Sequence, residues 1–162
     1  RLKEKQPDNL GEFTVPVGKI EVTKEGADVT LVTYGSTWRL VMEAAQELEK
    51  IGISAEVIDI QSLIPFDLSH EISESVKKTN RLVVIDEDVE GGATAFILQQ
   101  ILEKQKAFRY LDSDPLTISA ENHRAPYASD GDYFSKPSVD DMVEKIYGLF
   151  TESNPEKFPK IY

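Results

Sequence analysis

Residues Val29–Asp67 have the sequence VTLVTYGSTWRLVMEAAQELEKIGISAEVIDIQSLIPFD, in which two apolar runs flank a helical pattern. The first run ends at Gly35-Ser36, and the second, Ile53–Ile60, leads toward Asp67. Between the runs, apolar residues recur at the spacing of one helix face, and Gly52 follows as a stop signal. This is the pattern of a β-α-β unit, and repeated units of this kind build a parallel sheet covered on both faces.

Strand patterns occur at three further places along the chain. They are Lys19–Thr23, Arg81–Ile85 and Leu116–Ala120. The first alternates and is joined by a short turn to Val29–Tyr34, so we expect these two segments to form a hairpin. The run Arg81–Ile85 is apolar throughout, which favours a central position in the sheet.

Three further helices are expected to cover the sheet. One is capped by Asp67 and reaches about Lys78, one spans about Ala93–Gln105, and one closes the chain after the cap residue Ser138. The side chains expected to face inward are Leu68, Ile72, Ser75 and Val76; Phe96, Ile97 and Ile101; and Val139, Met142, Val143, Ile146, Leu149 and Phe150. We predict an α/β protein, a three-layer α/β/α sandwich whose mostly parallel sheet has about five strands.

Polar segments flank this pattern at both ends of the chain. We expect residues 1–14 to be a linker from a missing upstream domain, residues 15–150 to form one domain, and residues 151–162 to be a C-terminal tail. A length of 162 residues suits a single core. The chain opens at Arg1 rather than Met, so we expect it to be a piece of a longer protein.

The charge balance restricts the classes of partner. Lys and Arg total 18 against 29 Asp and Glu, a formal net charge of -11. Nucleic acid and anionic membrane surfaces would be repelled, whereas a basic protein would be attracted. The alternative is that the acidity only aids solubility.

Two absences exclude further classes of function. The chain has no cysteine, which excludes disulfides, thiolate metal sites and thiol catalysis within it and fits the cytosol. No apolar run approaches the roughly 20 residues that a membrane-spanning helix needs.

Two polar segments follow predicted strands and are candidate sites. Gly35-Ser36-Thr37 lies where doubly wound folds bind anions, but neither GxGxxG nor GxxxxGK[ST] is present, and the segment can serve simply as a turn and cap. The carboxylates of Asp86, Glu87, Asp88 and Glu90 could hold a hard cation or meet basic side chains, or form a solvated loop. Calcium-loop spacing is absent from this second segment.

The chain contains two histidines, the residue type most often used for proton transfer. His70 is expected on the exposed side of a helix with a structural role. His123 lies in a long loop at the carboxyl end of a strand and is the one histidine considered for proton transfer, the alternative being hydrogen bonding within the loop. Ser129-Asp130-Gly131-Asp132 does not match the Gly-Asp-Gly start of the thiamine-diphosphate motif. Spacing alone therefore indicates no complete catalytic set.

Several segments in order carry a family resemblance over about Val15–Phe150. They are VPVGKIEVTKEGADVTLVTYGS, ISAEVIDIQSLIPFD, ESVKKTNRLVVIDED, EGGATAFI and YLDSDPLTISAENHRAPYA. Together they resemble the C-terminal domain of the β part of 2-oxo acid dehydrogenase E1 components, the third domain of the transketolase superfamily.

This resemblance implies a thiamine-diphosphate-dependent enzyme that decarboxylates a 2-oxo acid and transfers the acyl group to lipoyl-E2. Pyruvate and branched-chain 2-oxo acids both stay open as substrates. The cofactor and its divalent cation would be bound by other domains, so the chain alone is expected to be inactive, with no cofactor, metal or catalytic residue of its own.

The implied task of this chain is assembly with other E1 domains or subunits, in a dimer or heterotetramer, and docking of the peripheral-subunit-binding domain of E2. The expected location is the cytoplasm, or the mitochondrial matrix in a eukaryote. Two alternatives are a transketolase-like or deoxyxylulose-phosphate synthase-like transferase and a stand-alone acidic module that binds proteins.

The resemblance also indicates partner-binding residues. In similar E1 β parts, an acidic residue of a Leu-Asp/Glu-Ala-Pro segment meets an arginine of the basic E2 domain, and Asp112 takes that position here. Two residues, Ser113 and Asp114, precede Pro115 where the family usually has one. The candidate partner-binding residues are Asp112, Asp114, Glu87 and Glu90, with the alternative that Asp112 only ends a helix or turn.

Overall fold

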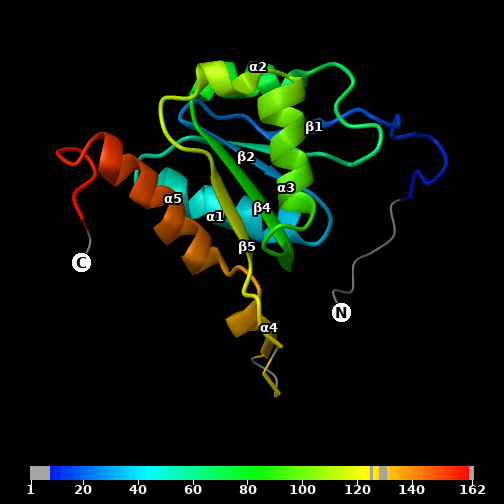
Figure 1. The fold of residues 1–162 in the computed structure, drawn as a ribbon. Helices are drawn as coiled ribbons and strands as arrows, with labels where there is room; N and C mark the ends of the chain where they lie inside the picture. Colours follow the sequence, from blue (N-terminus) through cyan, green and yellow to red (C-terminus); the bar gives the residue numbers. More distant parts are fainter. Residues whose placement is uncertain (1–7, 125, 128–130, 161–162) are drawn as a thin grey trace.

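The sheet at the centre of the molecule has five strands in the order β1-β3-β2-β4-β5 (Figure 1). The strands are β1 (Glu21–Lys24), β2 (Val29–Thr33), β3 (Ala55–Asp59), β4 (Leu82–Val89) and β5 (Leu116–Ala120). Strands β2 to β5 run parallel, and β1 pairs antiparallel with β3. This computed structural model describes residues 8–124, 126–127 and 131–160, so the outermost parts of the expected linker and tail lie outside the described residues.

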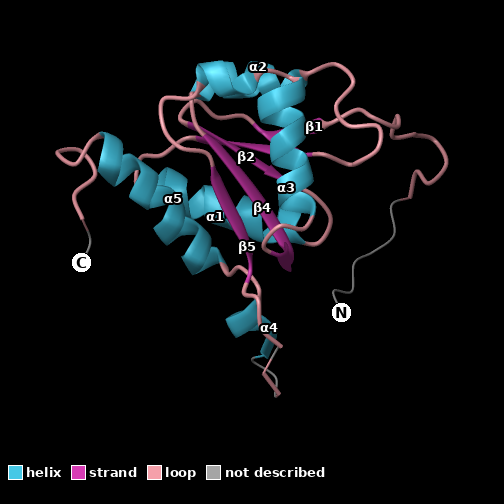
Figure 2. Cartoon of the chain, in the orientation of Figure 1, coloured by secondary structure: helices cyan, strands magenta, loops and turns pink. Residues whose placement is uncertain are grey.

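Helices cover both faces of the sheet (Figure 2). The helices α1 (Thr37–Lys50) and α5 (Val139–Ser153) lie on one face, and α2 (Glu71–Thr79) and α3 (Ala93–Leu98) on the other. The predicted three-layer sandwich is therefore confirmed. Helix α3 continues in π-helical turns over Gln99–Lys104, a 3-10 turn follows at Ala107–Tyr110, and α4 (Gly131–Ser135) is a short helix within the predicted long loop.

The buried apolar side chains form two cores, one on each face of the sheet. Val29 and Leu31 of β2 face α1 and α5, while Val32 faces α2 and α3. Most side chains expected to face inward from the helices are buried: Ile72, Ser75, Val76, Ile97, Ile101, Met142, Ile146 and Phe150. Four of the expected side chains are only half-buried at the edges of these cores: Phe96, Val139, Val143 and Leu149.

The predicted hairpin between the first two strands is wrong, because β3 lies between them. The turn before β2 crosses the start of β3 instead of folding β1 onto β2. The N–H groups of Ala27 and Asp28 donate to the Ser54 carbonyl (3.1 and 2.8 Å), and the Asp28 carboxylate accepts from the Ser54 N–H (2.7 Å). Gly26 is required there, since a Cβ on it would overlap the Ala55 backbone.

The central strand extends further than the sequence pattern indicates. Its position between β2 and β5 confirms the predicted central placement, but it continues to Val89 instead of ending at Ile85. A register shift against β5 follows Ile85. As a result Asp86, predicted to begin an acidic loop, is a strand residue and is only 3% exposed.

The predicted helix caps differ in outcome. Ser138 caps α5 as predicted, in a capping box with Asp141. Asp67 also caps α2, but from one turn before the helix, where its carboxylate accepts from the N–H groups of Glu71 (3.0 Å) and Ile72 (2.9 Å). Leu68 consequently lies outside the helix and is exposed, so its predicted inward position is wrong.

The segment after α5 packs back onto that helix. Phe158 is buried, with its ring centroid 5.3 Å from that of Phe150 and 5.8 Å from that of Tyr147. The Tyr147 hydroxyl donates to the Pro159 carbonyl (3.0 Å). These contacts make Phe158 part of the core under α1 and α5.

Candidate functional site

The strand order places the carboxyl ends of β2 and β4 side by side at a topological switch point. From β2 the chain passes through α1 on one face to reach β3, and from β4 it passes through α3 on the other face to reach β5. Ligands of open α/β sheets bind in the crevice that such a reversal leaves. The candidate site is therefore this carboxyl edge of the sheet.

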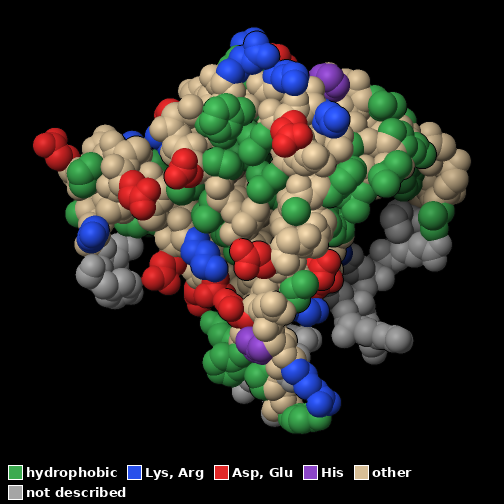
Figure 3. Space-filling view, viewed as in Figure 1, with side chains coloured by type: hydrophobic (Ala, Val, Ile, Leu, Met, Phe, Trp, Pro, Cys, Tyr) green, Lys and Arg blue, Asp and Glu red, His purple; other side chains and the backbone are tan. Residues whose placement is uncertain are grey.

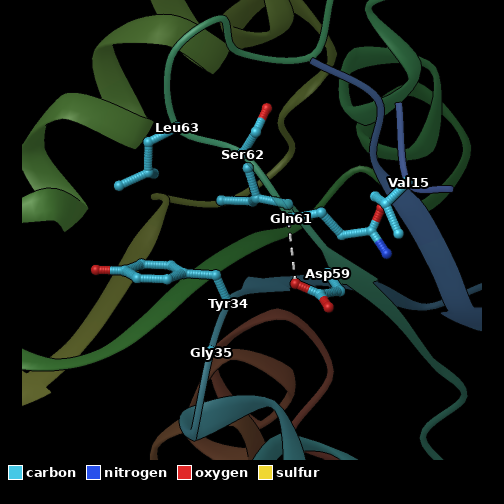
Figure 4. A pocket seen from close by; sticks show the side chains of 8 residues that line it. Val15, Tyr34, Gly35, Asp59, Gln61, Ser62 and Leu63 are labelled. Carbon is cyan, nitrogen blue, oxygen red and sulfur yellow. Dashed lines mark hydrogen bonds between the residues drawn. The ribbon is translucent and has the colours of Figure 1, made fainter. Parts of the chain in front are cut away.

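Two neighbouring cavities open at the carboxyl edge. One, of about 440 Å³, lies between the ends of β2 and β4, and the other, of about 460 Å³, lies beyond the end of β3 (Figure 4). Tyr34 and Gly35 line both cavities. The first cavity is also lined by Ser36, Thr37, Asp86, Glu87, Asp88 and Lys136, and the second by Val15, Asp59, Ile60, Gln61, Ser62 and Leu63.

A hydrogen bond between Tyr34 and Asp86 joins the two strand ends. The Tyr34 hydroxyl donates to the Asp86 carboxylate over 2.8 Å, and the other Asp86 oxygen accepts from the Glu87 N–H over 2.7 Å. Burial, this hydrogen bond, and the negative charges of Asp86, Asp88 and Glu87 raise the pKa of Tyr34 to about 12. The phenol therefore stays protonated at neutral pH and acts as a donor, not as a base.

Glu87 links the same edge to the segment before α5. Its carboxylate accepts from the Lys136 ammonium (3.1 Å) and from the Ser36 hydroxyl (2.9 Å), and these bonds lower the pKa of Glu87. Ser36 occupies the N-cap position of α1, as the predicted turn and cap requires, but its hydroxyl bonds to Glu87 and makes no capping hydrogen bond to the helix. The predicted tight turn is present, with Gly35 at a φ of 63°.

The second cavity contains a carboxyl group with the opposite shift. Burial and, to a smaller extent, the charge of Glu21 raise the pKa of Asp59, against the lowering effect of the Gln61 N–H, which donates to it over 3.2 Å (Figure 4). Asp59 therefore binds a proton more readily than an ordinary aspartate does. Gln61 has a φ of 59°, a left-handed conformation that places its N–H beside this carboxyl group.

The electrostatics of the carboxyl edge suit a cationic group such as an ammonium or guanidinium. Asp86, Glu87 and Asp88 line the first cavity together with a single cation, Lys136. A diphosphate would be repelled by these carboxylates. Among the described residues, no group of three or more His, Asp or Glu side chains could hold a metal ion. The described residues at this edge of the sheet thus do not fit thiamine diphosphate with its cation.

The two histidines considered from the sequence do not line either cavity. His123 is exposed, with its ring Nδ1 2.9 Å from the Arg124 carbonyl and its N–H donating to the Glu121 carbonyl over 2.8 Å. These contacts are hydrogen bonds within its own loop. His70 is exposed at the start of α2. Ser129 and Asp130, half of the compared thiamine-motif segment, lie outside the described residues.

The four candidate partner-binding residues divide between opposite edges of the sheet. Glu87 and Glu90 belong to the carboxyl end of β4, whereas Asp112 and Asp114 precede β5, which runs parallel to it. Asp112 is already engaged, since its carboxylate lies 3.3 Å from the Arg81 guanidinium and its N–H donates to the Asn80 carbonyl. Asp114 and Glu90 are exposed and make no hydrogen bond or ion pair with the described part of the chain.

Sequence reasoning missed Tyr34, Lys136 and Asp59 as members of the site. Tyr34 and Asp59 could have been found from their positions, because each lies at the carboxyl end of a predicted parallel strand, where ligand sites form. No sequence signal identifies Lys136, which reaches Glu87 across 49 residues of chain.

Comparison with known protein families matches residues 18–141 to the transketolase C-terminal domain. The chain belongs to this family. It is 39% identical over 132 residues to the mitochondrial pyruvate dehydrogenase E1 component subunit beta-2 of Oryza sativa subsp. japonica, a match covering 81% of the chain and 34% of that protein. It is 37% identical over 138 residues to the subunit beta of Rhizobium meliloti, covering 85% of the chain and 29% of that protein.

A solved structure described as a split gene transketolase, inactive beta4 tetramer, has the same fold. Its TM-score is 0.67 at 26% identity, covering 90% of this chain and 46% of that one. The family that the sequence segments resemble is thus confirmed. The chain spans about a third of the length of the two curated relatives. Within the described residues, no helix has the length and apolar character that a membrane crossing requires.

Proposed function

We propose that this transketolase C-terminal domain belongs to the β part of a thiamine-diphosphate-dependent 2-oxo acid dehydrogenase E1. The whole enzyme would decarboxylate pyruvate or a branched-chain 2-oxo acid and transfer the acyl group to a lipoyl group on an E2 partner. The observation that carries this proposal is the similarity, over more than four fifths of the chain, to pyruvate dehydrogenase E1 β subunits.

The task proposed for this chain is assembly and docking. The carboxylates of Asp86, Glu87 and Asp88 oppose a diphosphate, so the cofactor would be held by segments outside this chain. The cationic groups that this edge favours are instead those of protein side chains. Support for a partner role comes from exposed carboxylates such as Glu90 and Asp114, which make no ion pair with the described residues.

The enzymatic part is tested on the full-length protein. Purified enzyme is supplied with thiamine diphosphate, Mg²⁺, a lipoyl domain, and either pyruvate or a branched-chain 2-oxo acid, and acylation of the lipoyl group is followed by mass spectrometry. We expect acylation with at least one 2-oxo acid. Absence of both decarboxylation and acylation would contradict the proposal.

A transketolase activity is a second candidate, because the solved structure similar to this chain is described as a transketolase. The two candidates differ in their acceptors. Transfer of a ketol group to a sugar phosphate, without acylation of lipoyl, would favour the transketolase. The higher identities to E1 β subunits favour the dehydrogenase.

Docking is tested by comparing two neighbouring carboxylates at the amino edge of the sheet. Asp114→Asn removes a charge with no internal partner, so we expect weaker binding of a basic E2 domain at unchanged stability. Asp112→Asn also removes the ion pair with Arg81, whose side chain is only 16% exposed, so stability should fall with it. Calorimetric titration at two salt concentrations measures binding. Equal affinities of the wild type and both variants for the E2 domain would show that the amino edge of the sheet does not take part in docking.

A further inference from the structure

A groove of about 670 Å³ runs along the outer face of α5, on the side where that helix packs against α1. Val143 and Tyr147 supply apolar surface in it, and Glu144 and Glu152 line it with carboxylates. Positions 140, 144, 148 and 152 lie four residues apart and share one helix face, so the lined stripe is about 18 Å long. Acidic side chains lie over α5 in Figure 3.

Gly148 lies in the middle of this stripe, and no contact with the described residues explains why this position is a glycine. It is inside a helix of 15 residues, where glycine makes the helix less stable than alanine would. A Cβ added to it would meet nothing within 4 Å. Glycine in such a place allows the backbone of another segment to approach closely. Within the described residues no segment makes that approach.

The charges of the groove indicate what kind of segment would make it. Glu144 and Glu152 are exposed and have no ion pair with the described part of the chain. Lys160, from the segment after α5, already lines the groove, so a cationic side chain is accommodated there. A second copy placed α5 against α5 would bring like charges together, which is unfavourable. Nucleic acid would be repelled for the same reason.

We infer that the groove on α5 binds a basic amphipathic helix of a partner protein. Its apolar side would cover Val143 and Tyr147, its lysine or arginine side chains would pair with Glu144 and Glu152, and its backbone would pass close to Gly148. This contact lies on the outer face of a helix layer, away from the cavities at the carboxyl edge. It requires neither cofactor nor substrate, so its test is separate from the enzyme assay.

The test measures binding of a helical peptide probe to the full-length protein that contains this chain, by fluorescence anisotropy. The probe is a labelled peptide of about 18 residues, built from Ala, Leu and Lys, with Lys on one face and Leu beside it. We expect saturable binding that weakens at high salt, and weaker binding of a peptide with the same residues in a non-amphipathic order. Equal affinity for the two peptides would overturn the inference.

Variants locate the binding on the chain. Glu144→Gln/Glu152→Gln should weaken binding of the probe by roughly tenfold, since two ion pairs are lost. Gly148→Leu should abolish it, and circular dichroism should show an intact fold because leucine favours helix and the position is open.

A matched control, Glu74→Gln/Glu103→Gln, removes the same charge from other helical segments and should leave affinity within about twofold. A loss in this control as large as in the groove variant would assign the binding to net charge alone. Self-association of the chain that Gly148→Leu abolishes would assign the groove to a second copy. Either outcome overturns the inference.

Discussion

The two edges of the parallel sheet differ in how their polar side chains are satisfied. At the amino edge, Glu56 is 2% exposed and is bonded to Lys78 of α2 and to the Gly26 N–H. The Thr30 hydroxyl lies 2.7 Å from the hydroxyls of both Ser75 and Thr79. These bonds join β2, β3 and α2 to one another.

At the carboxyl edge, the polar side chains line cavities. Tyr34 and Asp86 bond to each other, but Glu87 and Lys136 form their pair at 45% and 42% exposure, and Asp88 stands exposed beside them. The buried polar side chains at the amino edge thus join neighbouring segments of the fold, whereas the polar side chains of Glu87, Lys136 and Asp88 at the carboxyl edge remain open to solvent. We therefore expect substitutions of the buried polar groups at the amino edge to cost more stability than substitutions at the carboxyl edge, while the exposed Asp114 at the amino edge stays available to a partner.

The largest loss of stability is expected from Gly26→Ala at the amino edge. The added Cβ would overlap the Ala55 backbone, which cannot move without displacing β3. We expect a loss of about 3 kcal/mol in the free energy of unfolding, measured by urea denaturation. The matched control is Gly148→Ala on open helix surface, which should raise stability by about 0.5–1 kcal/mol. Similar effects of the two variants would show that the close approach of Gly26 to Ala55 does not stabilise this edge.

Glu56→Gln should cost about 2 kcal/mol at neutral pH, because it leaves Lys78 without its buried partner. Burial raises the pKa of Glu56, but hydrogen bonds from Lys78, Ser75 and the Gly26 N–H outweigh burial and lower it overall. A lowered folded-state pKa means that the stabilisation is present above the unfolded value and lost as pH falls through the folded one.

The difference in unfolding free energy between wild type and Glu56→Gln should therefore shrink as the pH falls below about 4.3. Urea denaturation at neutral pH, and at successively lower pH, measures it. A difference that stays constant down to about pH 3 would show that the carboxylate charge of Glu56 does not stabilise the amino edge.

Tyr34→Phe is expected to have an intermediate effect at the carboxyl edge. It removes the hydroxyl that donates to Asp86, and Asp86 is 3% exposed and keeps only the Glu87 N–H as a donor within the described residues. We expect a loss of about 1 kcal/mol, lowering the thermal midpoint by a few degrees. Since Tyr133 is exposed, Tyr133→Phe is the control and should change little. A loss as large as that of Gly26→Ala would make both edges structural.

Glu87→Gln should have the smallest effect, below about 0.5 kcal/mol, because both partners of its ion pair are partly solvated. Lys136 and Ser36 lower the pKa of Glu87, so what stability the pair supplies is present above the ordinary glutamate range and lost below it. Thermal melts at neutral pH and in acid measure this. If Glu87→Gln destabilised the chain more than Tyr34→Phe, the contrast between the edges would fail.

The candidate site was predicted only in part, for reasons that particular residues show. The acidic run Asp86–Glu90 was found from composition, but its first member is a buried strand residue, because pairing with β5 continues past Ile85. Asp112 was identified from a family segment, but its ion pair with Arg81 depends on a contact between residues far apart in the chain. Tyr34 was counted only as a strand end.

Local patterns in the chain determined the β-α-β alternation, the central strand, the Ser138 cap and the family, because hydrophobic periodicity and capping depend on residues only a few positions apart. The tertiary structure alone decided that β3 separates β1 from β2, that Glu56 meets Lys78, and that Tyr34 meets Asp86. The strand order and these two side-chain pairs depend on how segments far apart in the chain pack together. Contacts of that kind produce no periodic pattern in the sequence from which they could be predicted.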